Sequence, residues 1–159
     1  MEYEMNRKTN DPGLTLIVGG TGKTGRRVAD RLQAKGVETR IASRSTSPAF
    51  DWHEPGNWNA VLEGVSAAYV TYAPDLAVPG AAAAIRRFVD RAVAQGVTRI
   101  VLLSGRGEEE ALACEQIVMA ADIEWTIIRA GWFMQNFSEG EFLGMVLDGA
   151  ITLPAADVP

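Results

Sequence analysis

The chain has 159 residues, 47% of them hydrophobic, and carries a formal net charge of −5. This length and composition suit a single globular domain with a substantial core. The charge excludes a surface that attracts nucleic acid or anionic lipid as a whole, and the single cysteine, Cys114, excludes an internal disulfide.

The pattern along the sequence argues against export, membrane insertion and zinc binding. The N-terminal segment lacks the apolar core of a signal peptide. The longest apolar-looking region, 65–85, is interrupted by Pro74, Asp75 and Pro79. No Cys/His cluster is available for zinc. We therefore expect a cytoplasmic protein that acts on a small molecule, binds no metal, nucleic acid or membrane, and can form homo-oligomers.

Strand and helix signals alternate from residue 14 to the end, after a flexible segment at 1–13. Apolar runs predict strands at 14–18, 37–42, 49–51, 65–71, 97–103, 124–129 and 151–153. Helical signals cover 24–35, 58–62, 85–93 and 108–121, and a capping box of Ser138 and Glu141 precedes a last helix ending at Gly149. Short links between such elements require parallel strands and right-handed crossovers. This alternation predicts an open α/β sheet with helices on both faces.

A glycine-rich segment, GGTGKTG at 19–25, follows the first predicted strand and opens the first predicted helix. A triphosphate-binding loop needs a glycine at position 17, where the sequence has Ile17. The spacing of Gly20, Gly22 and Gly25 instead fits the dinucleotide fingerprint, and Gly19 supplies the short-chain dehydrogenase version of it. These glycines permit a tight turn and bring backbone close to a pyrophosphate at the helix N-terminus. The segment predicts a dinucleotide loop.

The end of the second predicted strand indicates which dinucleotide binds. NAD sites usually present an acidic residue there to the ribose hydroxyls, whereas this chain has Ser43, Arg44 and Ser45. Arg44 can pair with a 2′-phosphate, and both serines can donate hydrogen bonds to it. The alternative is an ordinary surface arginine. We predict NADP, bound as NADPH, as the cofactor.

These motifs resemble the NmrA-like branch of the atypical short-chain dehydrogenase/reductases. Within that branch the chain is similar to the clavine dehydrogenases of ergot-alkaloid synthesis and their bacterial NAD(P)H-binding relatives. The stretches that carry the resemblance are GGTGKTGRRVA, ASRS, FDW, VSAAYVTYAPD, GVTRIVLLSG and EWTIIRAGWFMQNFSE. The resemblance implies a Rossmann-type, doubly wound NAD(P)-binding domain over residues 14–159.

The resemblance also implies the position of the cofactor along the chain. Thr21, Gly22, Lys23 and Thr24 would contact it, together with Ser43 and Arg44 at the adenosine phosphate, Asp51 and Trp52 at the adenine, Ala73 and Pro74 at the nicotinamide ribose, and Ser104 at the nicotinamide. The segment from Gly131 through Trp132, Phe133 and Met134 would flank the nicotinamide and the substrate. From the residues alone, aromatic side chains here serve a core or a pocket wall equally well.

No catalytic residue can be assigned, because the sequence contains no Tyr-x-x-x-Lys pair to protonate an alkoxide. Two functions follow. One is an NADPH-dependent oxidoreductase that reduces an iminium, a quinone or a similar planar, electron-poor substrate. The other is a non-catalytic dinucleotide sensor that regulates a protein partner.

The resemblance further implies that the usual C-terminal substrate lobe is missing, since family members continue well past the sequence GAITLPAADVP. Apolar groups near Trp132 would then be open to water, which promotes association. One wall of the substrate pocket would also be absent. We expect cofactor binding to survive and turnover to be weak unless another subunit supplies that wall.

Overall fold

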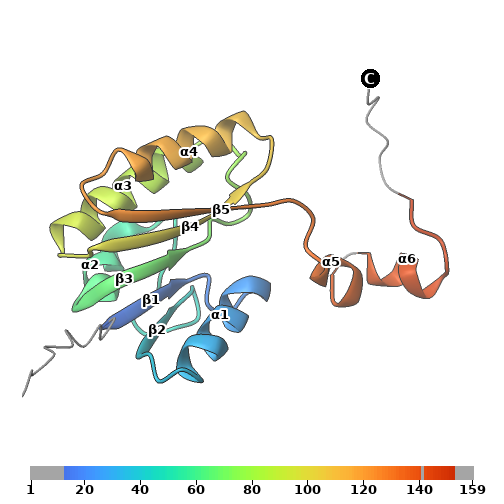
Figure 1. The fold of residues 1–159 in the computed structure, drawn as a ribbon, viewed down its shortest axis with the longest axis horizontal. Coiled ribbons are helices and arrows are strands. Elements are labelled where there is room, and N and C mark those ends of the chain that lie inside the picture. Colours follow the sequence, from blue (N-terminus) through green and yellow to red (C-terminus); the bar gives the residue numbers. More distant parts are fainter. Residues whose placement is uncertain (1–12, 141, 153–159) are drawn as a thin grey trace, which may run out of the picture. The chain divides into compact units, whose positions relative to one another are not determined.

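The fold is seen in a computed structural model, which describes residues 13–140 and 142–152 (Figure 1). Contacts divide the chain into two compact units that meet at Arg129 and Ala130. The first unit contains the sheet, and the second contains two short helices. None of the described helices has the length and apolar character needed to cross a bilayer.

The first unit is built on a five-stranded sheet with the order β2-β1-β3-β4-β5. Its strands are β1 (Leu14–Val18), β2 (Thr39–Ala42), β3 (Val65–Val70), β4 (Arg99–Gly105) and β5 (Glu124–Ala130). The strand β1 pairs in parallel with β2 and β3, and β3 pairs in parallel with β4. The order reverses direction between β1 and β3. In open α/β sheets such a reversal opens a crevice at the carboxyl ends of the strands, where ligands bind.

Helices cover both faces of this sheet, as expected (Figure 1). The helix α1 (Lys23–Gln33) packs on one face, where Ala29 meets Ile17 and Tyr69. The other face carries the larger core and the remaining helices of the unit, which are the 3₁₀ turn η1 (Pro55–Asn57), α2 (Trp58–Leu62), α3 (Ala81–Ala94) and α4 (Glu109–Met119). The chain therefore has the doubly wound Rossmann-type fold that the alternation of strands and helices predicted.

The short strand predicted at 49–51 is wrong. The Phe50 amide does donate to the carbonyl of Ser43 at 2.9 Å, but no strand ladder forms. The Phe50 ring instead stacks on Trp58 and meets Trp52 edge to face, with ring centroids 5.4 and 5.0 Å apart. Apolar residues at 49–51 therefore reflect an aromatic core under a loop, and packing rather than strand pairing fixes their conformation.

The second unit contains α5 (Gln135–Ser138) and α6 (Leu143–Leu147). The capping-box interpretation fails at Ser138, which ends α5, because Phe142 is the N-cap of α6 and makes no side-chain cap. Its other member, Glu141, lies outside the described residues. Gly149, with φ of +76°, follows the end of α6 and confirms the predicted stop.

The strand predicted at 151–153 does not form over its described part. Ile151 and Thr152 are exposed and have no regular structure, and Leu153 lies outside the described residues. An apolar pair such as Ile151 and Leu153 adopts a strand only where another strand pairs with it.

Candidate functional site

The turn between β1 and α1 is tight, as a dinucleotide loop requires. Gly19 has φ of +72°, a left-handed conformation that glycine tolerates without strain. The Gly22 amide donates to the Gly19 carbonyl at 2.9 Å, and Gly22 is the N-cap of α1. The chain therefore passes from strand to helix without room for the longer wrap of a triphosphate loop.

Two of the glycines are explained by close packing within the protein. A Cβ atom on Gly25 would lie 2.2 Å from the Gly19 carbonyl oxygen, so α1 rests directly on the loop backbone. A Cβ atom on Gly20 would lie 2.7 Å from Ile41 Cγ2 of β2. Gly22 is different, because its residue is exposed and the nearest atom to a Cβ there is the Gly19 oxygen, at 3.2 Å. Gly22 thus presents bare backbone to the outside, which is the surface that a pyrophosphate approaches.

The exposed start of α1 favours an anion. Thr21, Gly22 and Lys23 are all exposed, and the first turn of α1 contains no acidic residue. The partial positive charge of the amides at a helix N-terminus is therefore not offset by a nearby carboxylate on that helix. Thr24 is half-buried in the same turn and hydrogen-bonds to Tyr69 of β3.

Tyr69 is a contributor to this turn that sequence reasoning missed. Its side chain is 6% exposed, and burial raises the pKa of the phenol, an effect that the bond to Thr24 partly offsets. The phenol thus joins the centre of the sheet to the first turn of α1. The alternation of side chains along β3 could have placed Tyr69 on the α1 face, but nothing local indicated Thr24 as its partner.

The end of β2 lies beside the glycine loop. The amides of Gly19 and Gly20 both donate to the Ala42 carbonyl, at 2.9 and 3.3 Å. Ser43 follows directly, and its amide donates to Thr46 Oγ1 at 3.0 Å, which curls the chain into a turn. Sequence reasoning placed the loop and the Ser43 segment at one site, and the structure brings their backbones together.

Arg44 is exposed at the tip of this turn. It forms no ion pair with any residue in 13–140 or 142–152. The hydroxyls of Ser43 and Ser45 lie 3.0 Å apart and hydrogen-bond to each other. A cation next to two hydroxyls, with no carboxylate between, suits a phosphate better than a pair of ribose hydroxyls.

The residues expected at the adenine have structural roles of their own. Trp52 is 6% exposed and packs on Trp58 and Tyr72, with centroids 5.7 and 4.9 Å away. The Asp51 carboxylate accepts from the His53 amide at 2.8 Å, and the Asp51 carbonyl accepts from the indole nitrogen of Trp58 at 2.8 Å. Asp51 is half-buried and Trp52 is buried. The adenine contacts remain a prediction.

The segment expected at the nicotinamide ribose leaves the same edge of the sheet. Thr71 Oγ1 donates to the Val18 carbonyl at 3.0 Å, which ties the end of β3 to the end of β1. Ala73 and Pro74 follow after Tyr72 and are exposed. The ribose contact itself remains a prediction.

Ser104, at the carboxyl end of β4, takes part in a buried polar network. It is 4% exposed, and its hydroxyl donates to Glu115 Oε1 at 2.6 Å. Glu115 of α4 is fully buried and also accepts from Arg129 of β5, from Nη2 at 2.6 Å and from Nε at 3.0 Å. The bonds from Arg129 hold the pKa of the Glu115 carboxyl below its usual value, against the effect of burial, and the bond from Ser104 adds to this.

Sequence reasoning singled out Ser104 but missed Glu115 and Arg129. The available signal was Glu115 itself, a charged residue within the apolar stripe formed by Ala111, Cys114 and Val118 on α4. A charge at such a position is rarely buried without a partner.

The predicted substrate residues lie in the second unit, which is described here by itself. Trp132 and Met134 are 63% and 76% exposed, and Phe133 is half-buried. The Trp132 ring lies 5.4 Å from that of Phe142, which in turn lies 5.4 Å from Phe137. These rings form a small aromatic cluster, and a role in substrate binding remains a prediction.

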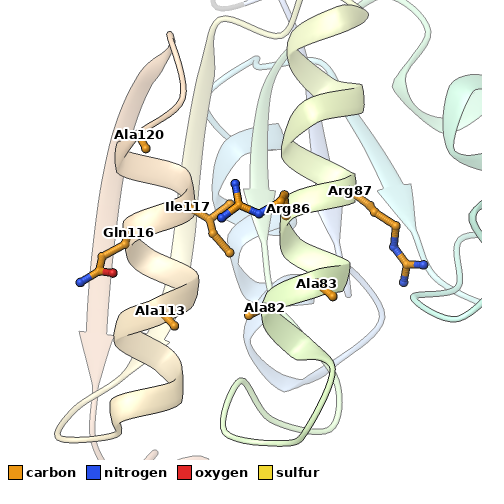
Figure 2. A pocket seen from close by; sticks show the side chains of 8 residues that line it. All are labelled: Ala82, Ala83, Arg86, Arg87, Ala113, Gln116, Ile117 and Ala120. Carbon is orange, nitrogen blue, oxygen red and sulfur yellow. The ribbon is translucent and has the colours of Figure 1, made fainter.

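The structure also has a hollow that is separate from the glycine loop. This shallow hollow of about 700 Å³ lies between α3 and α4 and is lined by alanines with Arg86, Gln116 and Ile117, and no glycine-loop residue reaches it (Figure 2). Among the residues that the structure describes, no group of three His, Cys, Asp or Glu side chains could hold a metal ion.

Comparison with known proteins confirms the resemblance to the clavine dehydrogenases. Agroclavine dehydrogenase of Claviceps fusiformis is 34% identical over 148 residues, which cover 80% of this chain and 50% of that protein. Festuclavine dehydrogenase of Aspergillus fumigatus is 33% identical over 146 residues, which cover 78% of this chain and 49% of that protein. The uncharacterized oxidoreductase YesF of Bacillus subtilis is 32% identical over 154 residues, which cover 89% of this chain and 53% of YesF. The chain is therefore a homologue of these oxidoreductases and spans about half of their length.

Solved structures show the same fold. Citrobacter triphenylmethane reductase, complexed with NADP(H), has a TM-score of 0.70 at 19% identity, over 87% of this chain and 56% of its own. An Escherichia coli NADPH-dependent quinone oxidoreductase, complexed with NADPH, has a TM-score of 0.66 at 18% identity, over 85% of this chain and 53% of its own. A short-chain dehydrogenase/reductase superfamily protein of Agrobacterium tumefaciens with bound NAD has a TM-score of 0.58 at 22% identity, over 73% of this chain and 48% of its own. No protein-family profile matches the chain.

Proposed function

We propose that the protein binds NADPH and acts as an NADPH-dependent oxidoreductase of the NmrA-like type. The observation that carries the proposal is the exposed backbone of Gly22 at the start of α1, within a turn whose Gly19 and Gly20 amides donate to Ala42, two residues before Arg44. The amides of Thr21, Lys23 and Thr24 would hold the pyrophosphate, Gly22, whose amide donates to Gly19, would let it approach the backbone, and Arg44 with Ser43 would hold the 2′-phosphate. The relatives that are named as dehydrogenases, and the fold neighbours complexed with NADP(H), support this assignment.

The substrate we propose is planar and electron-poor, such as an iminium ion or a quinone. NADPH supplies a hydride equivalent when bound. A hydride added to the carbon of an iminium turns the C=N π electrons into a nitrogen lone pair, so the product is a neutral amine and no acid is required. The chain has no Tyr-x-x-x-Lys pair to protonate an alkoxide. Several relatives are named agroclavine dehydrogenase and a fold neighbour is named quinone oxidoreductase, and both names are compatible with this class.

The test separates cofactor binding from turnover. NADPH and NADH would be titrated separately while cofactor fluorescence is followed. NADPH oxidation would then be measured against a panel of cyclic iminium ions, quinones and simple ketones. We expect tighter binding of NADPH and oxidation with iminium or quinone acceptors only. Binding of NADPH without turnover on any acceptor would favour the dinucleotide sensor, for which the missing acid pair is the supporting observation. No binding of either cofactor would refute both functions.

A further inference from the structure

The neighbouring strands β4 and β5 are tied to each other at both ends by an arginine and a glutamate. At the amino ends, Arg99 and Glu124, the first residues of the two strands, form an ion pair that is largely exposed. At the carboxyl ends, Ser104 and Arg129 are each the last residue but one. Both bind the same carboxylate, that of Glu115, which α4 delivers between them. The same pair of residue types thus occurs once with both side chains exposed and once with a buried glutamate and an arginine that is 53% exposed.

The buried Glu115 carboxylate is fully hydrogen-bonded, and its contacts are geometrically restrictive. Both oxygens of Glu115 accept a hydrogen bond from Arg129, and Oε1 also accepts from Ser104. A two-point contact between a guanidinium and a carboxylate fixes direction as well as distance. Because the Ser104 hydroxyl has a single hydrogen and donates it to Glu115, its rotation is fixed as well. The Glu115 side chain therefore restrains the carboxyl ends of both strands.

We propose that Glu115 is a positioning residue that fixes the carboxyl ends of β4 and β5 and so shapes the nicotinamide half of the cofactor site. The inference rests on the proposed function, because it assumes that NADPH lies along the carboxyl edge of the sheet. On that edge the strand order reverses between β1 and β3, so β4 lies on the opposite side of the crevice from β2. Glu115 acts through the backbone and through Ser104, and touches no ligand itself.

The adenosine half of the site stands on other elements. It consists of the glycine loop, the start of α1 and the end of β2, which are joined by the bonds from Gly19 and Gly20 to Ala42. None of the hydrogen bonds of Glu115 reaches these elements. A change at Glu115 should therefore weaken the nicotinamide half and spare the adenosine half. A purely structural role would weaken both halves together.

Two ligands separate the halves of the site. Adenosine 2′,5′-bisphosphate reports on the adenosine half alone, and NADPH reports on both. Affinity for each would be measured by calorimetry on the wild-type chain, Glu115→Gln and the matched control Glu124→Gln. The emission of bound NADPH would also be recorded, because it depends on the surroundings of the nicotinamide. Arg129→Lys, which keeps the charge and loses the two-point contact, provides a milder variant if Glu115→Gln fails to fold.

We expect Glu115→Gln to weaken NADPH roughly tenfold, as when one well-placed hydrogen bond is lost, and to shift the emission of bound NADPH toward that of free NADPH. Its affinity for the bisphosphate should stay within about twofold of wild type. Arg129→Lys should show a smaller change of the same kind, and Glu124→Gln should match wild type for both ligands.

The outcomes distinguish the inference from the proposed function. Equal weakening of both ligands in Glu115→Gln and Arg129→Lys, or no weakening of either, overturns the positioning role and leaves NADPH binding standing. Loss of NADPH affinity in Glu124→Gln overturns it too, since any tie between the strands would then suffice. If the wild-type chain binds neither NADPH nor the bisphosphate, the proposed function fails and this inference fails with it.

Discussion

Two glycines of the fingerprint, Gly22 and Gly25, should differ in how an alanine substitution affects the stability of the fold. In Gly25→Ala the new Cβ would lie 2.2 Å from the Gly19 carbonyl oxygen, well inside the 3.4 Å at which ordinary contact begins. That neighbour is backbone in a turn held by bonds to Ala42, so it cannot yield as a flexible side chain would. In Gly22→Ala the nearest atom lies at 3.2 Å, and the new methyl group enters solvent.

The magnitudes follow from these distances. Within a helix, alanine is favoured over glycine by about 0.5–1 kcal/mol. At Gly25 overpacking of about 1–3 kcal/mol opposes this gain. We therefore expect Gly25→Ala to reduce the free energy of unfolding by about 1–2 kcal/mol and to distort the loop enough to weaken NADPH. Gly22→Ala should leave stability within about 0.5 kcal/mol but still weaken NADPH, because its methyl group lies where the pyrophosphate approaches.

Urea denaturation would give the free energy of unfolding, and fluorescence titration the affinity for NADPH. The bulkier Gly22→Val should abolish binding without unfolding the chain. The reasoning is refuted if Gly25→Ala is as stable as wild type, or if Gly22→Ala binds NADPH with undiminished affinity.

Three further predictions concern charge. Arg44→Ala should remove most of the preference for NADPH over NADH. That preference should be roughly ten- to a hundredfold, because a charged hydrogen bond is worth about 1.5–3 kcal/mol. Equal affinity of wild type for the two cofactors would contradict the assignment. Wild type should hydrolyse ATP no faster than background, and Lys23→Ala should leave that rate unchanged. ATP hydrolysis by wild type that is lost in Lys23→Ala would show that the loop binds triphosphates. Glu115→Gln should reduce the free energy of unfolding at neutral pH by roughly 1–3 kcal/mol, against about 0–1 kcal/mol for Glu124→Gln in the exposed pair. Because the pKa of Glu115 is lowered by folding, its contribution is complete above the ordinary value of 4.5 and is lost as pH falls toward the folded-state pKa. The difference between Glu115→Gln and wild type should therefore shrink in acid unfolding titrations, and a difference that is constant down to pH 2 would contradict this.

Local sequence was enough for much of the fold because its signals agree with the tertiary structure. The run at Leu14–Val18 is buried on both faces of the sheet, so a short apolar segment could only be a central strand. The glycine loop was likewise readable, because the spacing of its glycines reflects a turn and a helix contact that only glycine allows. Predicted boundaries elsewhere differ slightly, as with α1 at Lys23–Gln33, since helix ends depend on the caps.

The failures lie where distant residues decide. Phe50 sits in a stretch that looks like a strand, but it is buried by rings from α2 and α3 rather than by a neighbouring strand. Ser138 has the spacing of a cap, yet it ends a short helix that the local pattern did not indicate. Phe50 was correctly read as apolar and given the wrong partner, whereas Ser138 does not act as a cap.

Glu115 shows what a single sequence leaves undetermined at a site. Its position in an apolar stripe indicates a buried charge, but the chain offers several arginines as a partner and no rule of spacing selects among them. Arg129 is selected by topology, because α4 connects the adjacent strands β4 and β5, and Ser104 and Arg129, near the carboxyl ends of these strands, both reach Glu115. The pair therefore becomes visible once the strand order is known. The chemistry that a Rossmann-type chain places at its carboxyl edge is, to this extent, a consequence of which strands are neighbours.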